Sequence, residues 1–233
     1  MCAIITAEYG IHEGSSSYLK GRDRVALTLE EVNNDGQREV ELQAEAQTVL
    51  DDLHLQSILQ TWGEPHLVGS MAMGLMACKD IDFNVLVAHV GADTLRAAYA
   101  AMAPVVVHPR VSRLRYASQL GQFNPDGSPV EEGFYCGIHY RAENREPWKI
   151  DVWAVVPPRP EIALRDQMTR ELSAEMRAAI LALKREVQQD ARYAAAGVHS
   201  RYVYHAALEG IRTWAQFQHW LAHHGFPSIP TPD

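Results

Sequence analysis

The chain has 233 residues, enough for one large domain or for a catalytic domain with a smaller appendage. Hydrophobic residues make up 47% of it, so it can bury a core, and bulk disorder is excluded. With 21 basic and 29 acidic residues the net charge is −8, which argues against broad binding to long nucleic acid or to an anionic membrane.

The three cysteines lie far apart and lack CxxC spacing, so neither a disulfide framework nor a zinc site is expected. The N-terminus has no basic leader and no long apolar segment, and no run approaches the roughly 20 apolar residues of a membrane span. We therefore expect a cytoplasmic protein.

The N-terminal part of the chain predicts a hairpin followed by a helix. Alternating apolar residues favour a strand over 25–32, and Asp35-Gly36 would turn the chain into a second strand over 37–43. Apolar residues then recur at helical spacing over 44–62.

The middle of the chain alternates short strands with short helices and loops, which indicates an α/β arrangement. In order, the expected elements are a strand at 66–68, a helix at 69–77, a strand at 80–88, a helix at 93–102, strand pieces at 105–107 and 111–116, a loop over 121–133, and strands at 134–142 and 148–156 joined by a short turn.

Pro157-Pro158-Arg159-Pro160 is the clearest boundary in the chain, because the apolar period changes after it. From Leu164 to Val187 apolar residues step by three or four, which predicts one long amphipathic helix. Two more helices are expected at 200–209 and 213–224, each followed by a glycine.

Two carboxylates stand out on the strand expected at 80–88. Asp80 and Asp82 share one face of it, while Ile81 and Phe83 point into the core. At ~4 Å two like charges repel by about 4 kcal/mol at an effective dielectric of 20, a cost that a base or a divalent cation can offset. Taken alone, such a pair is more often two solvated acids on an edge strand.

The segment before this pair favours a functional role for the two carboxylates. Gly69-Ser70 ends an apolar strand and opens a short helix, where free backbone N–H groups and a hydroxyl can meet a phosphate. The nine residues between Ser70 and Asp80 carry a short helix and return the chain to the sheet, so the phosphate and the carboxylates would meet at one end of it.

These residues resemble the signature of the nucleotidyltransferase superfamily related to DNA polymerase beta. That signature is an apolar residue, Gly, Gly or Ser, a spacer, then Asp, apolar, Asp or Glu, apolar, with a third carboxylate on a later strand. Here it reads Val68-Gly69-Ser70, nine residues, Asp80-Ile81-Asp82-Phe83, and Asp151 within Trp148–Trp153. The resemblance covers roughly residues 60–156.

The resemblance implies an α+β fold, with a nucleotidyltransferase-type mixed sheet flanked by helices and followed by a C-terminal helical domain. The catalytic domain with an N-terminal extension would span 1–157, and a helical domain over 158–233 would close over the substrate. Two departures concern phosphate binding: Met73 stands where many members have arginine, and Lys79 where many have serine.

The resemblance also implies roles for particular residues. Asp80, Asp82 and Asp151 would hold two Mg²⁺ ions, and Asp151 would take the proton of the acceptor hydroxyl. Nucleotide binding would fall to four residues: Gly69, Ser70, Lys79 and Lys149. Arg110, Arg113 and Arg115 are further candidates, although each is more often an ordinary surface charge.

The implied reaction moves a nucleoside monophosphate from an NTP, expected to be ATP, to a hydroxyl of a small molecule, and releases pyrophosphate. The acidic balance fits a small and often cationic acceptor, and antibiotic-modifying nucleotidyltransferases have this general make-up, so antibiotic resistance is one expected role. Two alternatives stay open: a toxin-like nucleotidyltransferase acting on tRNA or protein, and a non-catalytic nucleotide-binding module.

The last predicted helix carries a second candidate metal site. His219, His223 and His224 have a spacing that can ligate a metal, but histidines near a helix C-terminus also complement its dipole. The second interpretation is favoured.

Overall fold

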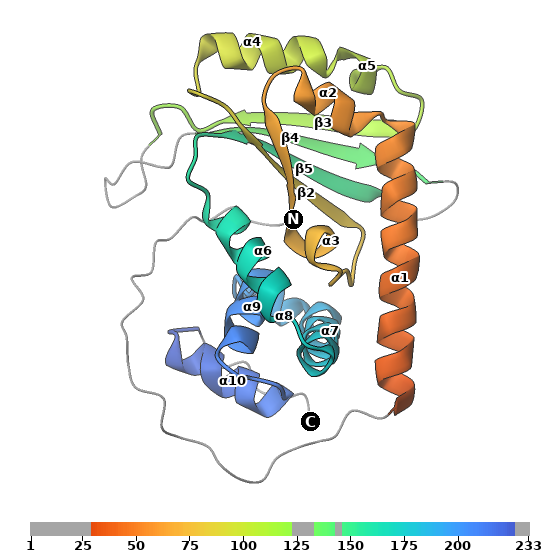
Figure 1. The fold of residues 1–233 in the computed structure, drawn as a ribbon, viewed down its shortest axis with the longest axis vertical. Helices are drawn as coiled ribbons and strands as arrows, with labels where there is room; N and C mark the ends of the chain where they lie inside the picture. The colour runs from red at the N-terminus through yellow and green to blue at the C-terminus, as the bar shows by residue number, and fades with distance from the viewer. Residues whose placement is uncertain (1–28, 123–132, 143–145, 227–233) are drawn as a thin grey trace. The chain divides into compact units, whose positions relative to one another are not determined.

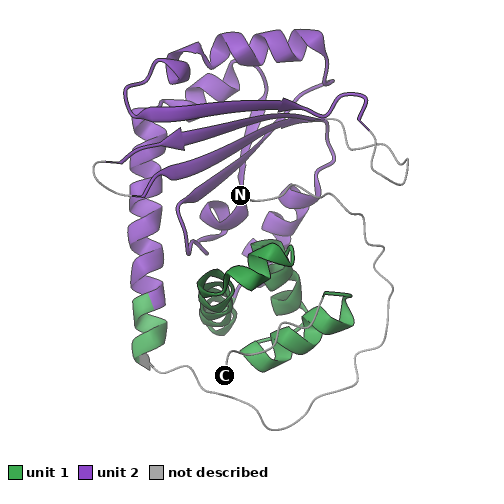
Figure 2. Cartoon of the chain, turned by 180° about the vertical axis from the view of Figure 1, so that it is seen from behind, with its two compact units in different colours: residues 1–34, 173–233 green, residues 35–172 purple. Residues whose placement is uncertain are grey.

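A computed structural model of the chain describes residues 29–122, 133–142 and 146–226. The chain divides into two compact units, residues 35–172 and residues 1–34 with 173–233 (Figure 2). The first unit holds a sheet and its flanking helices, and the second is helical where it is described.

The sheet has five strands in the order β1-β2-β5-β4-β3 (Figure 1). Its strands are β1 (Glu64–Val68), β2 (Asp80–Leu86), β3 (Val111–Ser118), β4 (Gly133–Tyr140) and β5 (Trp148–Val155). The pair β2–β5 is parallel and the other three pairs are antiparallel. The predicted α+β class with a mixed sheet flanked by helices is therefore confirmed.

Helices cover both faces of this sheet. The helices of the unit are α1 (Leu29–Asp52), which begins in the other unit, α2 (Leu55–Gln60), α3 (Gly69–Met73), α4 (Ala92–Ala101), α5 (Ala103–Val106) and α6 (Pro160–Glu171). Figure 1 shows α2, α4 and α5 on one side of the sheet and α3 and α6 on the other. The main core lies on the first side, between the sheet and the apolar residues of α1 and α2.

Alternation along the strands separates a core face from a polar face. In β2, Ile81, Phe83 and Val85 are almost fully buried in the core, and Asp80 and Asp82 are half-buried on the opposite face. The same alternation holds in β5. The sheet therefore presents the polar members of both strands on the face that carries α3 and α6.

The hairpin predicted over 25–43 is wrong where the structure describes it, because residues 29–52 form the single helix α1. Leu42, Ala46 and Val49 are buried, and this spacing of four and three residues marks one face of a helix. On the other faces, side-chain amides donate to carboxylates four residues away, as from Gln37 to Glu41. Asp35-Gly36 thus lies within a helix, and the alternation that suggested strands was misleading.

Three other boundaries differ from the prediction. The helix expected over 44–62 is interrupted at His54, which has a positive φ of 50°. Residues 105–107 do not form a strand, since α5 covers 103–106. The long helix expected from Leu164 to Val187 is two helices, because Ser173 caps a new one. The strands expected at 66–68, 80–88, 111–116, 134–142 and 148–156 and the helices expected at 69–77 and 93–102 are present with shifted ends.

Most of the loop predicted at 121–133 and part of the turn before β5 lie outside the described residues.

The helical unit contains α7 (Ala174–Gln189), α8 (Ala191–Ala195), α9 (Ser200–Leu208) and α10 (Trp214–His223). Both helices predicted after residue 199 are confirmed, and α10 starts with a capping box in which Thr213 and Gln216 satisfy each other's backbone N–H groups. The short α8 was not predicted. The aromatic residues of this unit, including Phe217 and Trp220, pack against one another in its interior.

Candidate active site

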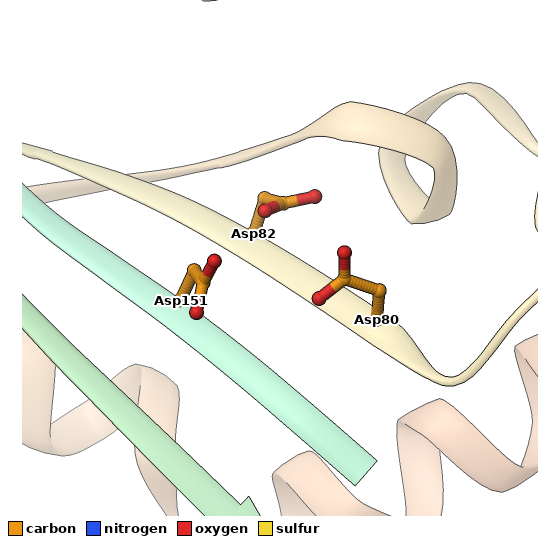
Figure 3. Close-up of side chains that lie close together, drawn as sticks. All are labelled: Asp80, Asp82 and Asp151. Atoms are coloured by element: carbon orange, nitrogen blue, oxygen red, sulfur yellow. The ribbon is translucent and has the colours of Figure 1, made fainter. Parts of the chain in front are cut away.

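Three aspartates meet on the polar face of the sheet. Asp82 in β2 lies directly beside Asp151 in the parallel strand β5, and Asp80 precedes Asp82 by two residues on the same face. Each residue offers one carboxylate oxygen, and these three oxygens lie within 4.8 Å of one another (Figure 3). The carboxylates predicted to act together are therefore brought together, with Asp151 pointing to the same side as the other two.

This arrangement concentrates negative charge. At 4.8 Å, two carboxylate charges repel by about 3 kcal/mol at an effective dielectric of 20. The ammonium of Lys149, two residues before Asp151 on the same face, forms an ion pair with Asp151 and lies 3.5 Å from Asp80. Burial alone would lower the pKa of Lys149, but the neighbouring Asp80 and Asp151 outweigh it and raise the pKa. Lys149 thus stays a cation among the acids.

The donor set fits a hard divalent cation. Carboxylate oxygens are the ligands that magnesium prefers, and three of them converge here at half-buried positions. In the part of the chain that the structure describes, this is the one group of three or more such side chains close enough to share a metal ion. The histidines of α10 do not form a second one.

A glycine turn closes over the carboxylates. Gly69 begins α3 with a positive φ of 66°, which a residue with a side chain rarely adopts. A Cβ on Gly69 would also lie 2.3 Å from Oδ2 of Asp82. The turn is therefore in contact with the acid on the neighbouring strand, and Ser70, which follows it, is buried.

Asp151 has a second partner that was not predicted. The hydroxyl of Tyr135 in β4 donates a hydrogen bond of 2.7 Å to Oδ1 of Asp151. Burial, and then the hydrogen bond to Asp151, raise the pKa of Tyr135, so that it remains a protonated donor. The sequence shows that Tyr135 belongs to a strand, but only the pairing of β4 with β5 reveals that it reaches Asp151.

The predicted basic residues are distributed unevenly. Lys149 lies at the carboxylates, whereas the ammonium of Lys79 pairs with Glu45 of α1 at 2.8 Å. Arg110 donates to the Tyr140 hydroxyl at 3.0 Å. The assignment of Lys79 to nucleotide binding stays a prediction.

Arg113 and Arg115 are exposed on β3. The strand register places Arg115 opposite Gly137, which in turn lies opposite Asp151. Arg115 therefore lies on the face of the three aspartates, two strands away from Asp151.

Helix α6 lies on this face next to the carboxylates, because it contacts β1 and β2 within two residues of the positions that pair at Asp82. Arg165 of α6 donates to the backbone oxygen of Leu67 in β1 at 2.9 Å, and the buried Asn84 of β2 donates to Glu161 of α6 at 3.3 Å. The polar side chains on this face of β2 thus run from Asp80 and Asp82 to Asn84, which contacts α6.

Comparisons with known proteins give structural similarity alone: no family model matches the chain, and no curated protein is similar to it in sequence. The chain is similar to the Cid1 poly(U) polymerase with bound MgGTP at 15% identity and a TM-score of 0.49, covering 71% of this chain and 50% of that one. It is also similar to terminal uridylyl transferase 4 from Trypanosoma brucei with bound GTP, at 16% identity and a TM-score of 0.43 over 86% and 57% of the two chains. A third similar structure is CdnC of E. coli MS115-1 with ATP, at 13% identity and a TM-score of 0.37 over 88% and 78%.

The chain spans about half the length of the Cid1 structures that it matches. With TM-scores below 0.5, these similarities add nothing on substrate or mechanism. The chain's own mixed sheet, its three converging aspartates and the glycine turn beside them have the arrangement that the sequence motif predicted. Among the described helices, none has the length and apolar character needed to cross a membrane.

Proposed function

We propose that the chain is a nucleotidyltransferase that moves a nucleoside monophosphate from a magnesium-bound NTP to an acceptor hydroxyl and releases pyrophosphate. One observation supports this above all: carboxylates from two adjacent parallel strands converge beside a glycine turn. The three half-buried carboxylates concentrate negative charge on one face of the sheet, and a divalent cation bound between them would offset that charge.

The metal would be held by Asp80, Asp82 and Asp151. Two bound Mg²⁺ ions would supply charge neutralisation for the triphosphate and would lower the pKa of the acceptor hydroxyl. We assign the β- and γ-phosphates to the backbone N–H groups at Gly69 and Ser70 and to the Ser70 hydroxyl, with the ammonium of Lys149 as a further contact.

In the reaction, the acceptor oxygen forms a bond to the α-phosphorus, and the bond from that phosphorus to the bridging oxygen of the β-phosphate breaks. The electron pair of the broken bond leaves with pyrophosphate. The hydroxyl proton passes to a carboxylate oxygen of Asp151, which acts as general base. Electrostatic positioning rather than covalent chemistry would carry the rate enhancement.

For the acceptor we propose a hydroxylated small molecule, as the acidic composition suggests. For the donor we propose ATP. An antibiotic is one such acceptor. The helical region over 158–233 would close over it, and the domain division at residue 157 is part of this proposal.

A second candidate acceptor carries phosphate. Arg113, Arg115 and His139 share the face of the aspartates on β3 and β4, and both arginines are exposed. The local cationic row that the two arginines form suits the phosphates of a nucleotide or an RNA end despite the negative charge of the whole chain.

The test is pyrophosphate release with each of the four NTPs over a panel of acceptors. The panel contains aminoglycosides, other hydroxylated metabolites, mononucleotides and short oligoribonucleotides. Wild type is expected to release pyrophosphate with at least one pair, and Asp82→Ala is expected to lower kcat by more than about 100-fold, the scale on which a lost electrostatic group acts.

Asp93→Ala is the matched control, because Asp93 is an exposed acid of α4 that pairs only with Arg96 among the described residues. It should retain wild-type activity. Equal activity of Asp82→Ala and wild type would rule the proposed function out.

A further inference from the structure

The hydroxyl of Tyr135 is held against a carboxylate that the metal site needs. Tyr135 is 7% exposed, and its ring packs against Trp153 of β5 with 4.9 Å between ring centroids. From there its O–H donates to Oδ1 of Asp151, while Lys149 contacts Oδ2. The two oxygens of Asp151 therefore have different partners, and the tyrosine fixes the rotation of the carboxylate.

The neighbouring glycine makes this contact possible. Gly137 lies directly opposite Asp151 in the pairing of β4 with β5. A Cβ built on Gly137 would lie 2.3 Å from the Tyr135 hydroxyl oxygen and 2.8 Å from the ring carbon that bears it. The phenol thus lies over Gly137 of its own strand, and from there its hydroxyl reaches Asp151 on the neighbouring strand. A side chain at position 137 would fill this space. Gly137 does not need to be glycine for its φ, which lies outside the left-handed region.

A tyrosine that served only for packing would not need a hydroxyl placed over Gly137 and bonded to Asp151. Trp153 would pack as well against a phenylalanine, which lacks the hydroxyl oxygen closest to the Gly137 Cβ position. A carboxylate with one oxygen engaged by a fixed donor loses less rotational freedom when a metal binds its other oxygen.

We propose that Tyr135 is a positioning residue for Asp151, and that Gly137 is required to leave room for it. Tyr135 holds Oδ1 and so fixes the rotation of the carboxylate that a divalent cation would meet together with Asp80 and Asp82. This inference rests on the proposed function, since it assumes that the three aspartates bind a metal.

The experiment measures binding of Mn²⁺ alone to the full chain, by electron paramagnetic resonance of the free ion, in wild type, Tyr135→Phe, Gly137→Ala and the double variant. Tyr135→Phe keeps the ring and removes the donor, and it should weaken Mn²⁺ binding about 10-fold, the lower end of the range for lost outer partners of metal ligands. Gly137→Ala should weaken it to a similar extent. The double variant should be no weaker than Gly137→Ala, because both changes remove the same hydrogen bond.

Tyr140→Phe is the matched control. Tyr140 also lies on β4, is buried, and donates to a carboxylate, Oδ2 of Asp52, at 2.6 Å. Asp52 is not one of the three converging aspartates, so this variant should bind Mn²⁺ as wild type does. Thermal unfolding without metal shows whether each variant is folded.

The outcomes separate the two proposals. Wild-type affinity in Tyr135→Phe, with Mn²⁺ bound by wild type but not by Asp82→Ala, would overturn the positioning role and leave the proposed function standing. Wild-type affinity in a folded Gly137→Ala would overturn the requirement for glycine. Absence of Mn²⁺ binding in wild type itself would remove the metal site and both proposals with it.

Discussion

Lys149 lowers the electrostatic repulsion among the three facing aspartates. Its ammonium contacts Asp151 and lies 3.5 Å from Asp80, with its side chain 35% exposed. Because its pKa is raised on folding, its attraction to the ionised aspartates stabilises the fold below its unfolded value of about 10.5 and is lost as the pH rises through the folded value. At neutral pH the contribution is present in full.

Lys149→Gln should therefore destabilise the metal-free protein. We expect the free energy of unfolding in EDTA to fall by about 1–2 kcal/mol, between the values for exposed and buried ion pairs. Magnesium should reduce this loss, since a bound divalent cation neutralises the same carboxylates. Urea unfolding in EDTA and in excess Mg²⁺ measures both quantities.

Lys79→Gln is the control for this measurement. Lys79 is paired with Glu45 rather than with the aspartates, and its side chain is also mostly buried. Its loss should cost the same stability with and without magnesium. If Lys149→Gln behaved in the same way, the three carboxylates would not be the place where magnesium binds.

At the scale of elements, the turn from β1 into α3 brings the backbone against a carboxylate. Gly69→Ala would place a methyl group 2.3 Å from Oδ2 of Asp82 and would add the cost of a positive φ, about 1–2 kcal/mol. Displacing Asp82 by even 1 Å should lower kcat/KM by about 100-fold. Steady-state pyrophosphate release, together with thermal unfolding, checks the expected result.

Gly121→Ala is the control that separates the cost of a positive φ from the displacement of Asp82. Gly121 has a nearly identical φ of 63°, and nothing lies within 4 Å of a Cβ built on it. It should lose similar stability but keep its activity. A Gly69→Ala variant that is folded and as active as Gly121→Ala would show that the turn has no part in holding Asp82.

The elements also show what the sequence can and cannot predict. Strand β2 was predictable, because its alternation of buried and polar residues coincides with strong strand formers. Asp151 was placed correctly because the strand around Trp148 is almost continuously apolar on its other face. Helix α1 was not predictable from alternation alone: the burial of Leu42 and Ala46 depends on packing against strands that are distant in sequence.

The sequence could not predict which side chains contact one another across strands, for a different reason. The contact of Tyr135 with Asp151 depends on the exact register of β4 on β5, and a shift of one residue would turn every side chain to the other face. The pairing of Lys79 with Glu45 likewise depends on where α1 lies over the sheet. Motif spacing predicts which acids converge, but it does not predict which neighbours orient them.

At the scale of the whole molecule, net charge and local charge point to different acceptors. The value of −8 opposes long nucleic acid, whereas Arg113 and Arg115 form a local cationic row on the face of the aspartates. Strands lie about 4.8 Å apart, so Arg115 stands roughly 10 Å from Asp151 along the sheet. This distance suits a phosphate one or two nucleotides away from the reacting hydroxyl.

Salt dependence distinguishes the two acceptor classes. If the acceptor is a short oligoribonucleotide, Arg115→Gln should raise its KM several-fold at low salt. It should also reduce the slope of log KM against log salt by about 0.7, the value for one released counterion on a single strand. A neutral hydroxylated acceptor has no such counterions, so its KM should change little with salt or with this variant.

Arg96→Gln provides the matched control, because Arg96 is also an exposed arginine but belongs to α4 and pairs with Asp93. It removes the same charge from the molecule and should leave the salt slope unchanged. Equal effects of Arg115→Gln and Arg96→Gln would mean that only the net charge matters, and the local row would then have no part in acceptor binding. An effect confined to Arg115 would instead place the acceptor across β4 and β3, because phosphate attraction at physiological ionic strength falls off within about 8 Å.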